Sequence, residues 1–163
     1  MSIYIDARLD VLAWVNRKAG TKLGINDVIF SKPIVNPDVG ATKNSKIRLT
    51  MRPEAAGFKG TVVLSYDRLS LANLANYPKP KYPPQASVGA SVYTLLTKLR
   101  SSYGVWLTQD DLEETFVTDN GAYGQVILKA KAESVGWVGE YVLVLSDKVP
   151  LAALFKTVSI NWS

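Results

Sequence analysis

Hydrophobic residues recur with helical spacing in two stretches of the chain. One stripe predicts a helix over residues 7–19, which Asp6 can cap, and the other predicts a helix over residues 91–103. Gly20 and Gly104 follow the stripes and are expected to end both helices in the left-handed conformation. The two stripes match at a spacing of 84 residues: Val11 with Leu95, Leu12 with Leu96, and Val15 with Leu99.

Beyond each predicted helix, apolar and polar residues alternate as they do in half-buried β-strands. Each half holds two such segments, which are expected to pair as a hairpin: residues 47–52 with 60–66, and residues 125–131 with 140–145. Short helices are expected at residues 69–76 and 150–155, and a last strand at residues 158–162. Residues 32–45 contain prolines and a glycine and predict an exposed loop.

Two further blocks repeat in the same order. Residues 54–60 match residues 133–139, each with an aromatic residue between two glycines, and residues 67–74 match residues 147–154. Repeated blocks in one order indicate an internal duplication. The sequence therefore predicts an α+β protein of two similar helix–β-hairpin–short-helix units, with antiparallel strands packed on the helices.

The predicted boundary between the units lies at a proline-rich segment. Residues 1–76 form the first unit, residues 77–90 the linker and residues 91–163 the second unit, and we expect them to share one compact domain. The run YPKPKYPP at residues 77–84 is typical of a stiff, extended linker. A ligand for a proline-binding domain is the alternative interpretation.

Cysteine and histidine are both absent. Their absence excludes disulfides, thiol chemistry, the usual zinc ligands and the commonest general base, so we expect no enzyme, cofactor or metal site. No apolar run is long enough to cross a bilayer, and acidic residues stand where a signal peptide would carry basic ones. We therefore expect no membrane partner and synthesis in the cytoplasm.

The net charge of +5 is unevenly distributed. Residues 1–80 carry 12 Lys/Arg and 6 Asp/Glu, whereas residues 81–163 carry 7 and 8. The two units are thus alike in apolar pattern and different in charge. A basic first unit can meet the acidic second unit of another copy, which predicts a head-to-tail homo-oligomer in a symmetric assembly.

One acidic cluster consists of Asp110, Asp111, Glu113 and Glu114. Neighbouring carboxylates can perform acid–base chemistry or bind a hard cation. Asp111, however, matches Asp27 of the first unit, which favours a capping role for both. The remaining acids are then expected on a solvated helical turn that Thr108 caps.

A basic set lies on the polar faces of the matching strands and comprises Arg48, Arg52, Lys129 and Lys131. Clustered Lys/Arg side chains can contact phosphates, so this set is a candidate nucleic-acid surface. The simpler interpretation is a solvated sheet face that meets an acidic neighbour. Because the chain has no recognisable nucleic-acid motif, we do not expect nucleic acid as its partner.

Three aromatic residues are candidate contact residues. Phe58 and Trp137 occupy the same place in the repeated glycine loop, where an exposed ring can stack on a sugar or a partner chain. Alternatively, each ring folds back over its hairpin on a path that the glycines permit. Trp14 matches Lys98 and lies off the apolar stripe, which makes it a better interface candidate than Trp106.

Several segments together resemble a known class of proteins. They are RLDVL at residues 8–12, IRLT at 47–50 and DRL at 67–69, then SVYTLL at 91–96, YGVWLT at 103–108 and GWVG at 136–139. This pattern, from about residue 6 to residue 145, resembles small virion structural proteins of tailed bacteriophages. The resemblance implies a non-enzymatic role within the virion. We expect this role to be in the collar, tail, baseplate or capsid surface, with other virion proteins as partners. The competing hypothesis is a binding module for nucleic acid or for a host-surface glycan.

Overall fold

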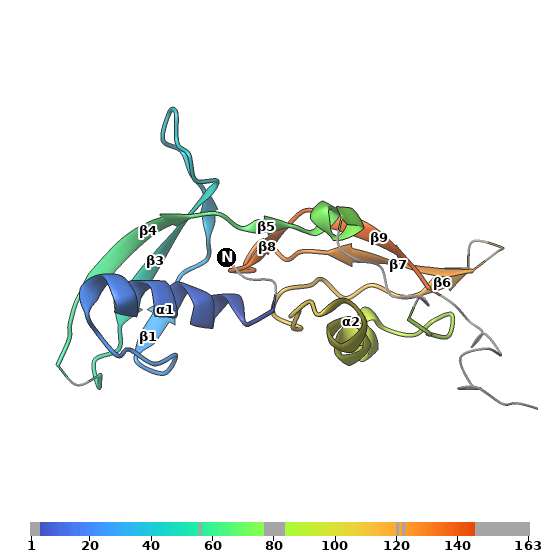
Figure 1. Ribbon diagram of the computed structural model, residues 1–163, viewed down its shortest axis with the longest axis horizontal. Helices are drawn as coiled ribbons and strands as arrows, with labels where there is room; N and C mark the ends of the chain where they lie inside the picture. The colour runs from blue at the N-terminus through green and yellow to red at the C-terminus, as the bar shows by residue number, and fades with distance from the viewer. Residues whose placement is uncertain (1–3, 56, 77–83, 120, 122, 146–163) are drawn as a thin grey trace, which may run out of the picture.

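The computed structural model describes residues 4–55, 57–76, 84–119, 121 and 123–145. The protein is an elongated, mixed α+β molecule with more strands than helices and two antiparallel sheets (Figure 1). We call residues 4–76 the first half and residues 84–145 the second half. Residues 77–83 of the predicted linker, the helix predicted at residues 150–155 and the strand predicted at residues 158–162 lie outside the described residues.

The helix of the first half is α1, Ala7–Ala19, as the apolar stripe predicts. The Asp6 carboxylate caps it by accepting a 2.9 Å hydrogen bond from the Arg8 N–H. Gly20 ends it with φ 67°, and the Gly20 N–H donates to the carbonyl of Asn16. Both predicted ends of this helix are confirmed.

Four strands form the sheet of the first half: β1 (Val28–Phe30), β2 (Ile34–Val35), β3 (Ser45–Met51) and β4 (Thr61–Tyr66). β3 pairs antiparallel with each of the other three. Ile47 and Leu49 point from β3 into a core that contains Val11 of α1. The prediction of a loop over residues 32–45 was partly wrong, because β2 lies within it and pairs with the start of β3.

The second half begins with a tighter helix than predicted. A 3₁₀ turn, η2 (Val92–Leu95), precedes the α-helix α2 (Leu96–Tyr103), so the expected single α-helix over residues 91–103 was wrong in its first turn. The Ser91 hydroxyl accepts a hydrogen bond from the Tyr93 N–H at this end. Gly104 ends α2 in the left-handed conformation, as predicted.

The second sheet consists of β6 (Thr118–Asp119), β7 (Gly124–Lys129) and β9 (Glu140–Val144), with β7 in the centre. Val126 and Leu128 of β7 and Leu143 of β9 pack in a core with Leu95 and Leu99. Each hairpin therefore packs apolar side chains against the helix of its own half.

The end of the first half crosses into the second half. β5 (Leu69–Ser70) pairs in parallel with β8 (Trp137–Val138), and the 3₁₀ helix η1 (Leu71–Asn76) follows β5. The predicted short helix over residues 69–76 thus starts as a strand. Leu71 and Leu74 are buried in the core of the second half, so the first half completes the second.

Backbone hydrogen bonds recur at matching positions of the two halves. The Arg52 N–H donates to the Asp27 carbonyl (2.9 Å), and the matching bond of the second half runs from Lys131 to Asp111 (2.8 Å). Likewise, the Met51 N–H donates to the Gly60 carbonyl (2.9 Å), and its match runs from Ala130 to Gly139 (2.9 Å). The strand register recurs as well, since Ile47 lies opposite Leu64 and Val126 lies opposite Leu143. The two hairpins are therefore alike in pairing as well as in apolar pattern.

Candidate functional site at the joint between the two halves

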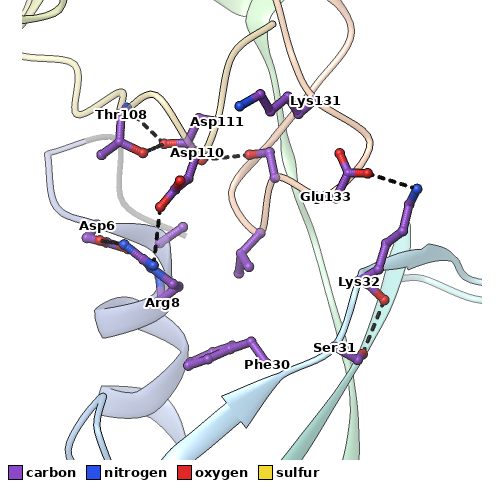
Figure 2. Close-up of a pocket in the computed structure, with 13 residues that line it drawn as sticks. Asp6, Arg8, Phe30, Ser31, Lys32, Thr108, Asp110, Asp111, Lys131 and Glu133 are labelled. Carbon is purple, nitrogen blue, oxygen red and sulfur yellow. Dashed lines mark hydrogen bonds and ion pairs between the residues drawn. The ribbon is translucent and has the colours of Figure 1, made fainter.

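A cleft of about 610 Å³ lies where the two halves meet, and we call it the joint cleft (Figure 2). The start of α1 and the end of β1 contribute one wall, and the segments around residues 108–111 and 131–135 contribute the other. Its lining residues are Asp6, Ala7, Arg8, Phe30, Ser31, Lys32, Thr108, Asp110, Asp111, Lys131, Glu133, Ser134 and Val135. Its size and its charged lining make the joint cleft the candidate functional site.

Arg8 links the first turn of α1 to the second half. Its guanidinium lies 2.8 Å from an Asp6 carboxylate oxygen and 3.5 Å from an Asp110 oxygen (Figure 2). Burial alone raises the pKa of Asp6, but the hydrogen bonds and positive charge of Arg8 outweigh it and hold the pKa below its ordinary value. Both Asp6 and Arg8 are therefore kept in their charged forms.

Asp111 closes a turn and fastens a neighbouring loop. One carboxylate oxygen accepts hydrogen bonds from the Thr108 N–H (3.0 Å) and hydroxyl (2.8 Å), and the other accepts one from the Ser134 hydroxyl (2.7 Å). Asp27 closes the matching turn by accepting a 2.7 Å bond from the Gly24 N–H. Both aspartates were expected to cap a helix, but in the structure each closes a turn instead, and no helical turn capped by Thr108 is present at residues 108–111.

The remaining charged residues of the joint cleft also have partners. The Lys32 ammonium lies 3.1 Å from Glu133, and the Lys131 ammonium donates a 2.7 Å bond to the Gln109 carbonyl. A hydrogen bond from a backbone N–H lowers the pKa of Glu133, and the bond from Lys32 lowers it further. Each ionisable side chain that lines the cleft is thus engaged by another group of the protein.

These contacts connect the two halves of the protein. A general base needs a proton acceptor directed at a substrate, whereas the carboxylates here accept bonds from the protein itself. In the part of the chain that the structure describes, no group of three or more His, Cys, Asp or Glu side chains is placed to hold a metal ion. The arrangement can therefore fix the position of the halves relative to each other.

Two further residues, for which the sequence predicted no role, bridge the halves through backbone carbonyls of the segment around residues 132–135. The Tyr66 hydroxyl donates a 2.8 Å hydrogen bond to the Val135 carbonyl. The buried Arg68 guanidinium donates to the Ser45 hydroxyl at 2.9 Å and to the carbonyls of Ala132 (3.4 Å) and Ser134 (3.5 Å). In the sequence, Arg68 lies in the repeated block at residues 67–74 and in the DRL segment of the resemblance, but neither pattern gave it a role.

The predicted acidic cluster is divided by the fold. Asp110 and Asp111 line the joint cleft, but Glu113 and Glu114 do not. Glu113 lies 2.8 Å from the Lys129 ammonium, and Glu114 accepts a 2.8 Å bond from the Ser91 hydroxyl. The four carboxylates therefore do not form one site, and each has a partner within the chain.

The predicted basic set is divided as well. Arg48 and Arg52 are exposed in the first half, and Arg48 lies opposite Val63 in the hairpin. In the second half, Lys129 is paired with Glu113, and Lys131 lines the joint cleft. Among the described residues, the side chains of Arg48 and Arg52 are therefore the two of this set with no ion pair or hydrogen bond.

The aromatic candidates differ sharply in exposure. Trp137 is only 3% exposed, so its ring does fold into the protein, whereas its match Phe58 is 49% exposed. Trp14 is 46% exposed and lines a cavity of about 290 Å³ with Tyr66 and Asp67. Trp106 lies under the Arg100 guanidinium, 3.4 Å from its ring centroid. Of these four aromatic residues, Phe58 and Trp14 are the ones exposed to a partner.

Comparison with protein families gives a match over residues 1–161 to a family of unknown function, DUF7941. No curated protein and no solved structure matches the chain. Within the described residues, no helix has the length and apolar character needed to cross a membrane.

Proposed function

Since the chain belongs to the DUF7941 family, whose function is unknown, we propose its role from its own residues: it is a non-enzymatic structural component of a tailed-phage virion. It acts through protein–protein contacts in the collar, tail, baseplate or capsid surface. The resemblance of its sequence segments to small virion structural proteins supports a location in the virion. The contacts in the structure support a structural, non-enzymatic role.

The observation that carries this proposal is the chemistry of the joint cleft. It is the largest of the cavities described above, and its charged side chains bind one another across the two halves. An active site instead keeps at least one group with a perturbed pKa directed at the substrate. Charges that pair across the cleft fix the two halves relative to each other, which supports a structural role.

We further propose that the two halves descend from one unit by internal duplication. The support is the recurrence of the left-handed glycines, the turn-closing aspartates, the hairpin register and the backbone hydrogen bonds at matching positions. A duplicated unit that packs on its own copy already contains a self-complementary surface. Such a chain is suited to assembly with further copies of itself.

The charge difference between the halves has less support than apolar surface as the basis of assembly. Asp110, Asp111, Glu113 and Glu114 all bind partners within their own chain, as do Lys129 and Lys131. Contacts between copies would therefore have to compete with existing pairs. We propose that assembly depends mainly on apolar surface, and that charge affects only how the copies approach.

The test is the composition of purified particles of the phage whose genome encodes the chain. Quantitative mass spectrometry of density-purified virions should find the chain in a fixed ratio to the major capsid protein, and labelled antibody should mark one location. An early replication protein of the same phage serves as the control for contamination. A chain that is abundant in the lysate but absent from the particles would overturn the proposal.

A filter-binding assay at low and moderate salt distinguishes nucleic-acid binding from the structural role. Phosphate contacts by Arg48 and Arg52 would give retention that falls steeply with salt, because counterions are released on binding. The structural role predicts no retention above that of the R48Q/R52Q double variant. Specific retention by the parent chain alone would favour the binding-module alternative.

A further inference from the structure

The first half ends in a segment that docks on the second half. The Leu69 N–H donates a 2.8 Å hydrogen bond to the Gly136 carbonyl, and β5 lies beside β8 with Leu69 opposite Trp137. Leu71 and Leu74 then enter the core of the second half, where they are 0% and 5% exposed. We call residues 67–74 the docking segment.

The sequence contains this segment twice. Residues 147–154, DKVPLAAL, match the docking segment, DRLSLANL, and place Val149, Leu151 and Leu154 where it has Leu69, Leu71 and Leu74. This second copy lies outside the described residues, and it matches the docking segment in sequence. Pro150 stands at the position that matches Ser70, and a proline has no N–H to donate. The hydrogen bond to the second half is donated by Leu69, however, and its match Val149 has an N–H.

The first half contains a matching receiving surface, and it is open. In the second half the docking segment is received by Trp137 and by a group that surrounds Leu74, including Leu99, Tyr141 and Leu143. The matching residues of the first half are Phe58, Val15, Val62 and Leu64.

The exposure of these residues shows that the surface is uncovered within the described residues. Phe58 is 49% exposed against 3% for Trp137, and Val62 is 45% exposed although its partner Leu49 in the hairpin is buried. Val15 and Leu64 are half-buried, whereas their matches Leu99 and Leu143 are buried. An apolar surface of this kind is usually covered by a partner.

The segment cannot reach the receiving surface of its own chain. Three residues separate Leu145 from Val149, so this connection spans at most about 14 Å. β9 alone is about 17 Å long, from five residues at about 3.4 Å each. In Figure 1 the turn between β3 and β4 lies at one end of the long axis, while β9 runs toward the other end. The receiving surface must therefore belong to another copy.

We propose that residues 147–154 of one chain dock on the first half of the next chain. In this contact Val149 lies beside Phe58 and donates its N–H to the Gly57 carbonyl, while Leu151 and Leu154 cover Val15, Val62 and Leu64. The contact is a strand addition with apolar anchors, and it joins unlike surfaces of two copies. Repetition of it produces a ring or a filament. The inference rests on the proposed structural role and names its partner, a second copy of the chain.

Cysteine crosslinking tests the register, because the parent chain has no cysteine. Ser70 and Val138 are register partners, and their matches are Pro150 and Lys59. Neighbouring strands place such residues roughly 5 Å apart, within disulfide range. Mixing the single variants K59C and P150C under mild oxidation should give a disulfide-linked heterodimer. The control mixture is V39C with P150C, since Val39 is fully exposed and lies outside the receiving surface.

Two substitutions in the full chain test the apolar anchors. L151D should weaken self-association in sedimentation experiments by at least roughly tenfold, because it places a charge in a buried apolar contact. A152D is the matched control and should leave association unchanged, because its match Ala72 is exposed. High salt should not dissociate the parent oligomer, in contrast to a contact made by charges.

Equal crosslinking in both mixtures, or equal association of L151D and A152D, would overturn the proposal. Circular dichroism checks that the variants fold. If the chain is found in virions yet stays monomeric in all these experiments, head-to-tail docking fails and the structural role stands. If the chain assembles through this contact but is absent from virions, the virion role fails and the docking contact stands.

Discussion

The hydroxyl of Tyr66, the last residue of β4, donates a 2.8 Å hydrogen bond to the backbone carbonyl of Val135, 69 residues further along the chain. The bond joins the hairpin of the first half to the loop that precedes β8. Only a neutral phenol can donate this bond. The pH of the solution can therefore test how strongly the joint contributes to stability.

Stability should fall in the alkaline range because of Tyr66. Burial raises the pKa of its phenol from 10.0 to about 12, although the nearby charge of Arg68 opposes this. Because the folded-state pKa is above the unfolded one, the stabilisation is complete below pH 10 and is lost as the pH rises toward 12. We expect a loss of about 1–2 kcal/mol, reduced from the full shift by partial exposure.

The measurement is urea unfolding at several pH values for the parent chain and for Y66F. Y66F should be less stable by about 1 kcal/mol at neutral pH, because it lacks the bond to Val135. It should also lose less stability than the parent between pH 10 and 12. An identical alkaline loss in Y66F would show that other groups cause it.

Replacement of Arg68 should be costly because its side chain is buried and bonded on both sides of the joint. R68M removes the donor to the Ser45 hydroxyl and to the carbonyls of Ala132 and Ser134. We expect a loss of about 2–4 kcal/mol in the free energy of unfolding. R48M changes an exposed arginine in the same half and should cost less than about 0.5 kcal/mol. Equal losses would contradict the role of Arg68 in the joint.

Trp137 and Phe58 provide a matched pair at one position of the repeated loop. W137A removes a buried ring from the larger core and should cost about 3–5 kcal/mol. F58A removes an exposed ring and should cost less than about 1 kcal/mol in the unfolding of the monomer. Thermal unfolding of dilute protein gives both values. A large loss for F58A under monomeric conditions would show that its ring already has a binding site within the chain.

Asp111 and Asp27 are a second matched pair. Asp111 accepts three hydrogen bonds, from Thr108 twice and from Ser134, whereas Asp27 accepts one from Gly24. D111A should therefore cost about 2–3 kcal/mol and D27A about 1 kcal/mol, as measured by urea unfolding. The reverse order would indicate that the turn matters more in the first half than in the second.

Local pattern was sufficient for much of the fold. The apolar stripe, Asp6 and Gly20 predicted α1 with both of its ends, and strict alternation predicted β3 and the hairpin that it forms. These features depend on residues close in sequence, whose spacing and backbone preferences determine the element directly. The prediction for the first turn of the second helix was wrong because residues 92–95 form a 3₁₀ turn, which the same apolar spacing also permits.

The sequence by itself determined the matching apolar pattern of the two halves, the absence of Cys and His, and the residues that end each helix. Only the tertiary structure decided what each repeated position does. It buried Trp137 and left Phe58 exposed, separated Glu113 and Glu114 from Asp110 and Asp111, and placed Arg68 at the joint. The physical reason is that matching residues have the same local preferences but different neighbours. The docking segment covers the second half, while the matching surface of the first half has no such cover within the described residues.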